Sequence, residues 1–299
     1  MSGEIADWLV TTGRGQKPTL RWSFSVDAPL TDVRLARETG EVVAADVSGG
    51  LYLLDRRGQV KALTRTRHSV KRLAWSDTGG AGAVILDDSS VGWFDKHLQF
   101  QWIRELPDEI VSVAVDPYGT HVALGTADGV NVVVTQGNKK CSRFETARPI
   151  RHIQFLTQSS ELIVASEYGF IGRYTLAGVP VWTSKLWSTV GELAATGDGR
   201  SIFLAGFAHG IQAFDGQTGD TRGTFVCEGT VGLVCCGFTK RGIVGYTLER
   251  TLFSVDDSGT PKWNVSPDED IQKIILSPLG DFMICGFTSG RIMRLDMAS

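Results

Sequence analysis

The stretch IVSVAVDPYGTHVALGTADGVNVVVT, residues 110–135, contains three short apolar runs separated by the turn sequences DPYG and TADG. The runs are too short and too interrupted for helices. Val113 and Val115 are two residues apart, which is the spacing of side chains on one face of a β-strand. The stretch therefore predicts three strands joined by tight turns.

This pattern recurs about every forty residues along the chain. The residue that ends the third run advances in steps of 40 residues, and once of 41, through Asp55, Asp95, Thr135, Thr175, Asp215, Asp256 and Asp296. The residue before each of these markers is apolar. The residues twenty-two and twenty positions before each marker are apolar as well. We therefore expect one unit in seven copies, with a fourth strand after the third run.

A unit of about forty residues with four strands is typical of a β-propeller blade, and blades pack radially because one blade cannot bury both its faces alone. We predict an all-β fold, a seven-bladed β-propeller of four-stranded antiparallel blades. The first strands of the blades are expected to start near residues 30, 70, 110, 150, 190, 231 and 271. Residues 18–299 form this single domain in the prediction, and residues 1–17 form a leader.

Several repeats resemble known propeller families. Residues 110–135 and 271–296 (IQKIILSPLGDFMICGFTSGRIMRLD) resemble WD-repeat blades, and residues 49–63 (GGLYLLDRRGQVKAL) and 209–220 (HGIQAFDGQTGD) resemble quinoprotein-like (PQQ-like) repeats. The resemblance implies the propeller fold over nearly the whole chain. It does not carry over the WD-repeat hydrogen-bond network, because only Trp93–Asp95 approaches the third-strand signature and no Gly-His pair opens the blades.

The seventh copy stops after its third run. In alternate copies tryptophan lies seven residues after the marker, as Trp102, Trp182 and Trp263, and the same phase projected backward reaches Trp22. We therefore predict that a strand at about residues 18–28 completes the last blade. It would close the ring through hydrogen bonds between the chain ends and remove an open sheet edge.

The leader has the spacing of a short amphipathic helix. Ile5, Trp8 and Leu9 fall on one helical face, and Ser2 is a suitable N-cap. Two placements are open: the helix packs on the rim of the propeller, or it docks in a groove of a partner.

The composition is that of an ordinary soluble globular protein, with 42% hydrophobic and 21% charged residues and a net charge of −3. This charge gives no field that would attract nucleic acid or an anionic membrane. The five cysteines show no CxxC spacing, so we expect no disulfide framework, no metal site and a reducing compartment. The N-terminus lacks a signal-peptide pattern and no stretch approaches the roughly 18 apolar residues of a membrane span. A cytoplasmic location is expected.

The sequence also lacks the common catalytic signatures: GxSxG, HExxH, a phosphate loop or a dinucleotide fingerprint. Its five histidines fall in different blades and loops, and only His68 and His152 are expected near the channel mouth. No carboxylate and amide set for a quinone cofactor is recognisable. We therefore predict no catalytic residue, no metal ligand and no cofactor.

The channel mouth is the most variable part of the repeat. The position twenty-three residues before each marker, at the start of the first strand, takes seven different side chains: Asp32, Arg72, Ser112, His152, Glu192, Leu233 and Lys273. Two interpretations are open. Either a solvated channel mouth tolerates any polar residue at this position, or the ring and its adjoining loops differ from blade to blade because together they bind one particular partner.

The loops before these strands alternate in charge. Residues 65–72 and 147–152 are basic, whereas residues 106–109 and 266–270 are acidic. Such alternation suits a protein or peptide partner and suits a uniform polyanion poorly. Trp187 lies in a further loop, either as an exposed binding anchor or as a cap on a neighbouring core.

These observations predict a non-enzymatic interaction scaffold, a monomeric propeller within a complex, that presents its charged rim and channel mouth to a protein or peptide. A small-molecule or sugar-acting enzyme at the channel mouth and nucleic-acid binding through the basic loops are the alternatives. The residues predicted to contact the partner are Asp32, Arg65, Arg67, His68, Lys71, Arg72, Asp108, Glu109, Arg148, Arg151, His152, Trp187, Glu192, Asp268, Glu269, Asp270 and Lys273.

Overall fold

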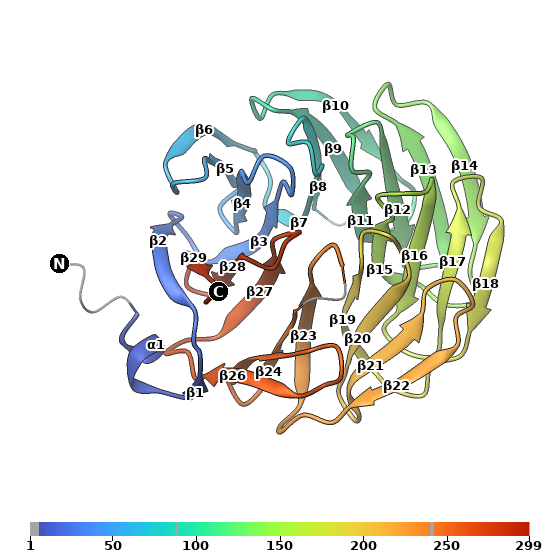
Figure 1. The fold of residues 1–299 in the computed structure, drawn as a ribbon. Helices are drawn as coiled ribbons and strands as arrows, with labels where there is room; N and C mark the ends of the chain where they lie inside the picture. Colours follow the sequence, from blue (N-terminus) through green and yellow to red (C-terminus); the bar gives the residue numbers. More distant parts are fainter. Residues whose placement is uncertain (1–5, 88, 240–241, 299) are drawn as a thin grey trace.

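The computed structural model describes residues 6–87, 89–239 and 242–298. Seven antiparallel sheets surround a central opening (Figure 1), and in each sheet the chain runs outward from the strand nearest the opening. The innermost strands are β3 (Leu30–Leu35), β7 (Val70–Trp75), β11 (Ile110–Val115), β15 (Ile150–Phe155), β19 (Val190–Ala195), β23 (Val231–Cys236) and β27 (Ile271–Leu276).

The remaining strands repeat in the same order in every blade. The second strands are β4 (Val42–Asp46), β8 (Ala81–Leu86), β12 (His121–Thr126), β16 (Glu161–Ser166), β20 (Ser201–Gly206), β24 (Ile243–Thr247) and β28 (Phe282–Phe287). The third strands are β5 (Gly50–Leu54), β9 (Ser90–Asp95), β13 (Val130–Thr135), β17 (Ile171–Thr175), β21 (Gly210–Asp215), β25 (Leu252–Val255) and β29 (Arg291–Asp296). The outer strands are β6 (Val60–Arg65), β10 (Phe100–Glu105), β14 (Lys140–Glu145), β18 (Pro180–Ser184), β22 (Thr221–Phe225), β26 (Pro261–Val265) and β2 (Thr19–Ser25).

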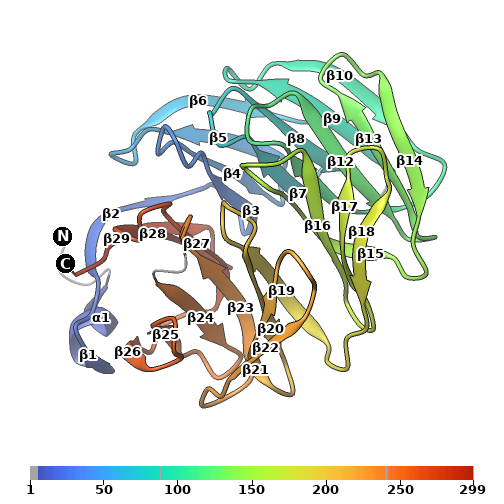
Figure 2. The same ribbon diagram turned by 45° about the vertical axis from the view of Figure 1, so that its right-hand side comes forward.

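The outer strand of the seventh blade comes from the other end of the chain. β2 pairs antiparallel with β29, from Thr19 opposite Asp296 to Ser25 opposite Arg291. Figures 1 and 2 both show β2 beside β29. The fold is therefore a seven-bladed β-propeller closed by its N-terminal strand, as the forty-residue period and the phase of Trp22 predicted.

The leader makes a second contact with the ring. β1 (Arg14–Gly15) pairs with β26 and adds a fifth strand to the sixth blade. The helix α1 (Asp7–Thr11) buries Trp8 and Leu9 in the core that the sixth and seventh blades share. The helix thus packs on the propeller. Its described N-cap is Ala6, without a side-chain hydrogen bond, and the predicted contributions of Ser2 and Ile5 lie outside the described residues.

The hydrophobic cores lie between neighbouring blades. The adjacent residues Cys235 and Cys236 illustrate this arrangement, because consecutive side chains of a strand point to opposite faces. Cys235 is buried among residues of the sixth and seventh blades, whereas Cys236 packs with residues of the fifth and sixth. Each sheet therefore contributes to two cores, and the ring must close for every face to be covered.

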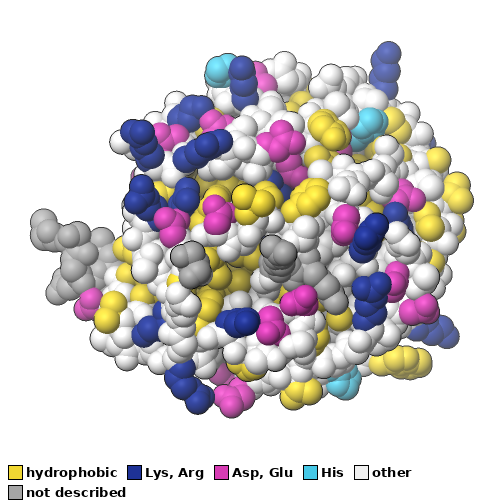
Figure 3. Space-filling model, in the orientation of Figure 1, with side chains coloured by type: hydrophobic (Ala, Val, Ile, Leu, Met, Phe, Trp, Pro, Cys, Tyr) yellow, Lys and Arg dark blue, Asp and Glu magenta, His cyan; other side chains and the backbone are white. Residues whose placement is uncertain are grey.

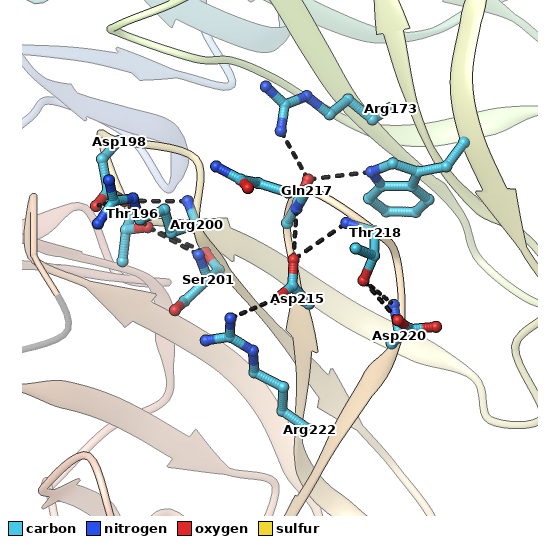
Figure 4. A network of polar contacts seen from close by, with 12 residues as sticks. Arg173, Thr196, Asp198, Arg200, Ser201, Asp215, Gln217, Thr218, Asp220 and Arg222 are labelled. Atoms are coloured by element: carbon cyan, nitrogen blue, oxygen red, sulfur yellow. Dashed lines mark hydrogen bonds and ion pairs between the residues drawn. The ribbon is translucent and has the colours of Figure 1, made fainter.

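Tryptophans in three outer strands join their blade to the next one in the ring. The indole N–H groups of Trp22, Trp102 and Trp182 each donate to a backbone carbonyl 34 residues further on, at distances of 2.9, 2.7 and 3.0 Å. That carbonyl lies in the turn before the outer strand of the next blade. The Trp182 acceptor, the carbonyl of Gly216, also accepts from Arg173 Nη1 at 2.8 Å (Figure 4).

Candidate interaction site

The ring has two faces with different connections. Because neighbouring strands are antiparallel, the links from one blade to the next and the turns between second and third strands share one face, here called the rim face. The turns after the first and third strands form the opposite face, here called the turn face. All of the residues predicted to bind a partner belong to the rim face or to the channel mouth that opens on it.

A β-bulge in every inner strand directs one side chain into the channel. In the fourth blade Ile150 is opposite Ser166, but His152 is opposite Ala165, so the register shifts between them. The same shift occurs at the equivalent residues of all seven blades. A bulge changes which face the following residues occupy. The residue before it is therefore buried in a core, whereas the predicted ring position lines the channel.

The channel is a cavity of about 640 Å³ whose mouth holds an ion pair. Lys273 Nζ of the seventh blade donates to Glu192 Oε2 of the fifth, past the apolar Leu233 of the sixth. His152 Nδ1 of the fourth blade lies 3.8 Å from Glu192 Oε1. Burial opposes ionisation of Glu192, but the charge of Lys273 and the contact with His152 outweigh it, so the pKa of this carboxyl is lowered.

Other polar side chains of the channel hold neighbouring blades together. Asp32 Oδ2 accepts the backbone N–H of Leu73 at 3.0 Å, while Arg34 Nε donates to the carbonyl of the same residue at 2.8 Å. The amide of Gln154 makes an equivalent pair of 3.0 Å bonds with the backbone of Ala195. These side chains are therefore used in blade-to-blade contacts.

The predicted rim residues have different environments. Several are paired within the rim: Arg65 with Asp27, His68 Nδ1 with Asp87 at 2.9 Å, Asp270 with Arg250, and both Asp268 and Glu269 with Arg291. Arg151 lies 3.9 Å from Glu167, and Asp108 is partly buried. Arg67, Lys71, Arg72, Glu109 and Arg148 are exposed. His68 and His152 are thus separated, since only His152 lines the channel.

Trp187 is exposed over 76% of its surface. The adjacent Leu186 is buried in the core of the fourth and fifth blades, so it is Leu186 that caps this core. Five further exposed apolar side chains of the rim face were not predicted: Val47, Tyr168, Phe207, Val226 and Leu248. Tyr168, Phe207 and Leu248 occupy turns between second and third strands. Phe207 and Leu248 directly follow the second strand, where other blades carry Val47, Asp87, Ala127, Glu167 or Thr288, and Tyr168 lies one residue later in its turn, so the sequence signal is a large apolar side chain in such a turn.

The described residues contain no cluster of three or more potential metal ligands. All five cysteines carry free thiols. Within the described part of the chain, no helix has the length and apolar character needed to span a membrane.

Comparison with solved structures supports the fold. The β-propeller domain of Cps50 (Swd1) from Myceliophteria thermophila superposes with a TM-score of 0.81 over 94% of this chain and 100% of that one, at 14% sequence identity. An identity this low shows a common fold alone. No family model and no curated protein matches the sequence.

Proposed function

We propose that this propeller is a non-enzymatic scaffold that binds a protein or peptide partner on its rim face, as one component of a complex. The observation that carries this proposal is the state of the channel mouth. Its ionisable side chains are largely used in contacts between blades, as in the hydrogen bonds of Asp32 and Arg34 with the backbone of Leu73. A catalytic pocket would instead need converging groups free to exchange protons with a substrate.

The charge distribution favours a protein partner over nucleic acid. Arg67 and Arg72 are exposed on one sector of the rim, whereas Glu109 and Glu228 are exposed on others. Figure 3 shows positive and negative side chains interspersed on one face of the molecule. A polyanion gains affinity from a continuous basic surface, whereas a protein surface can match charges of both signs.

The test is affinity capture from cells that express this protein at its natural level, with a charge-reversed rim. Arg67→Glu combined with Arg72→Glu is the informative variant, because neither arginine has an ion-pair partner among the described residues. Arg65 is left unchanged, since it pairs with Asp27. We expect the variant to lose a partner that the wild-type chain retains at physiological salt, with an unchanged melting temperature.

The matched control is Arg57→Glu combined with Lys139→Glu, which makes the same charge change in two turns of the turn face. This control should retain the partner. Equal capture by both variants would show that the rim basic residues do not bind it. Capture of nucleic acid, with a steep fall in affinity as salt rises, would favour the nucleic-acid alternative.

A further inference from the structure

Four exposed apolar side chains in neighbouring loops of the rim face are here called the apolar platform: Tyr168, Trp187, Phe207 and Leu248. Backbone contacts join the loops that carry them. Tyr168 forms a β-bridge with Thr189, two residues after Trp187, and Phe207 N donates to the carbonyl of Thr189 at 3.2 Å. The fourth, fifth and sixth blades therefore present these side chains from connected loops.

Two glycines form the floor between Phe207 and Leu248. A Cβ at Gly191 would lie 2.3 Å from the carbonyl oxygen of Gly232 and 2.8 Å from the Phe207 ring. A Cβ at Gly232 would lie 3.2 Å from Leu248 Cδ2 and 4.0 Å from the Phe207 ring. Neither glycine has a positive φ, so the backbone conformation does not require glycine there. At Gly191 the nearby carbonyl of Gly232 and the Phe207 ring leave no room for a side chain, and at Gly232 the Leu248 side chain packs over the backbone.

Of the surrounding carboxylates, those without an ion-pair partner among the described residues lie beside the sixth-blade end of the platform. The loops of the fourth to seventh blades that surround it carry six carboxylates, on Glu167, Glu228, Glu249, Asp268, Glu269 and Asp270. Four of the six lie near a cation: Arg250 is bound to Asp270 through both carboxylate oxygens, at 2.6 and 2.9 Å, Arg291 pairs with Asp268 and Glu269, and Arg151 lies 3.9 Å from Glu167. Exposed Arg148 lies beside the fourth-blade end of the platform, where a Cβ at Gly169 would be 3.7 Å from its Nε, and exposed Lys185 lies in the loop of Trp187. Glu228 has no ion-pair partner among the described residues, and Glu249 accepts the backbone N–H of Thr230 at 2.8 Å. The strongly basic loop, residues 65–72, belongs to the opposite side of the ring.

We infer that the apolar platform binds a segment of a partner protein in which two or more large apolar side chains are flanked by lysine or arginine. Exposed Trp, Tyr and Phe side chains are the types that contribute most to binding at protein interfaces. Glu228 and Glu249 beside the sixth-blade end would pair with the basic flank, and Arg148 beside the fourth-blade end would repel it. The charge asymmetry thus sets the direction in which the segment lies. This inference rests on the proposed function and names the chemistry of the partner.

The experiment is selection of a displayed random-peptide library on the immobilised full chain, followed by binding of the enriched peptides in solution. We expect the enriched peptides to share aromatic or leucine residues flanked by lysine or arginine. Measured by fluorescence anisotropy, Trp187→Ser combined with Leu248→Ser should weaken binding by about tenfold or more. Glu228→Lys should weaken it severalfold, with a larger effect at low salt.

Two matched controls separate the platform from general surface effects. Val60→Ser combined with Val179→Ser removes exposed apolar side chains outside the platform, and Asp257→Lys reverses a carboxylate of the turn face. Each should change the dissociation constant by less than about twofold. Failure to enrich any peptide, enrichment without a basic flank, or binding unaffected by Trp187→Ser with Leu248→Ser would each overturn the inference.

The remaining outcomes distinguish this inference from the proposed function. If Arg67→Glu combined with Arg72→Glu abolishes peptide binding and the platform variants do not, the result would support the proposed scaffold function. It would reject the apolar platform as the binding surface. A dimer of the wild-type chain in sedimentation velocity that Trp187→Ser abolishes would show that a second copy covers the platform. If the protein floats with anionic vesicles and this requires Trp187, a membrane covers the platform. Either result would overturn the inference.

Discussion

Glu192 and Lys273 form an ion pair between the fifth and seventh blades, across a channel position that the sixth blade fills with Leu233. Both side chains are more than four-fifths buried. The pair therefore connects inner strands that are not neighbours in the ring. Its formation requires the fifth, sixth and seventh blades to be packed together.

The first prediction concerns the dependence of stability on pH. The folded-state pKa of Glu192 is lowered relative to the unfolded chain, so its ionised form stabilises the fold. This contribution is fully present above the unfolded pKa of about 4.3 and declines as the pH falls below it towards the folded value. Glu192→Gln should therefore lower the free energy of unfolding by about 1–3 kcal/mol at pH 7, and by progressively less below pH 4.

Urea denaturation of the wild type and Glu192→Gln across this pH range measures the effect. Lys273→Met should be similarly destabilising, because it leaves Glu192 without its cation. The double variant should lose less than the sum of the two single losses. A loss that is additive and independent of pH would contradict a functioning pair.

The second prediction concerns the contact of Trp182 with the next blade. Gly219 has φ +80°, and a Cβ there would lie 2.5 Å from the Trp182 ring. Gly169 has a similar φ of +86°, but its nearest neighbour would be Arg148 Nε at 3.7 Å. Alanine at either position costs about 1–2 kcal/mol for the left-handed backbone, and only Gly219→Ala adds a clash of about 1–3 kcal/mol. Gly219→Ala should therefore have the lower melting temperature, and equal melting temperatures would rule out the contact.

The sequence predicted the fold because its signals are local and repeated. Each signal lies within a few residues: the spacing of apolar residues in a strand, the turn residues and the phase of Trp22. Because the unit occurs seven times, an ambiguous strand in one copy is settled by the other copies. The bulge in the inner strands has a local signal as well. Residues such as Ile150 and Ile153 are apolar three positions apart, which breaks the strand alternation.

The candidate interaction site was only partly predictable, because its contacts join distant parts of the ring. Nothing near Glu192 in sequence indicates that Lys273, 81 residues later, neutralises it. The apolar platform is similar: Tyr168, Phe207 and Leu248 each occupy a separate turn, and an isolated apolar residue in a turn has many explanations. Their proximity follows from the radial packing of three blades.

The third prediction concerns thiol reactivity. Burial raises the pKa of the Cys236 and Cys285 thiols to about 12, and it raises the pKa of Cys235 and of Cys227 as well. Since the thiolate is the reactive form, these four should react slowly with Ellman's reagent at pH 8, whereas the exposed Cys141 should react at once. One rapid thiol is therefore expected in the native protein and five after denaturation.

Cys141→Ser is the control for this measurement, and it should remove the rapid phase while leaving the total in denaturant at four of the original five. More than one rapid thiol in the native wild type would show that the link carrying Cys227, or an inner or middle strand of the sixth or seventh blade, opens readily.

The last prediction separates the two contacts of the N-terminal segment. Deletion of residues 1–17 removes α1 and β1 but keeps β2, so it should cost the burial of Trp8 and Leu9, about 3–5 kcal/mol, and leave a closed ring. Deletion of residues 1–29 also removes β2 and exposes the edge of β29. We expect this longer deletion to abolish cooperative unfolding and to promote aggregation, measured by calorimetry and light scattering. If both truncated chains melt alike, closure by β2 contributes little to stability and the ring is held mainly by its inner strands.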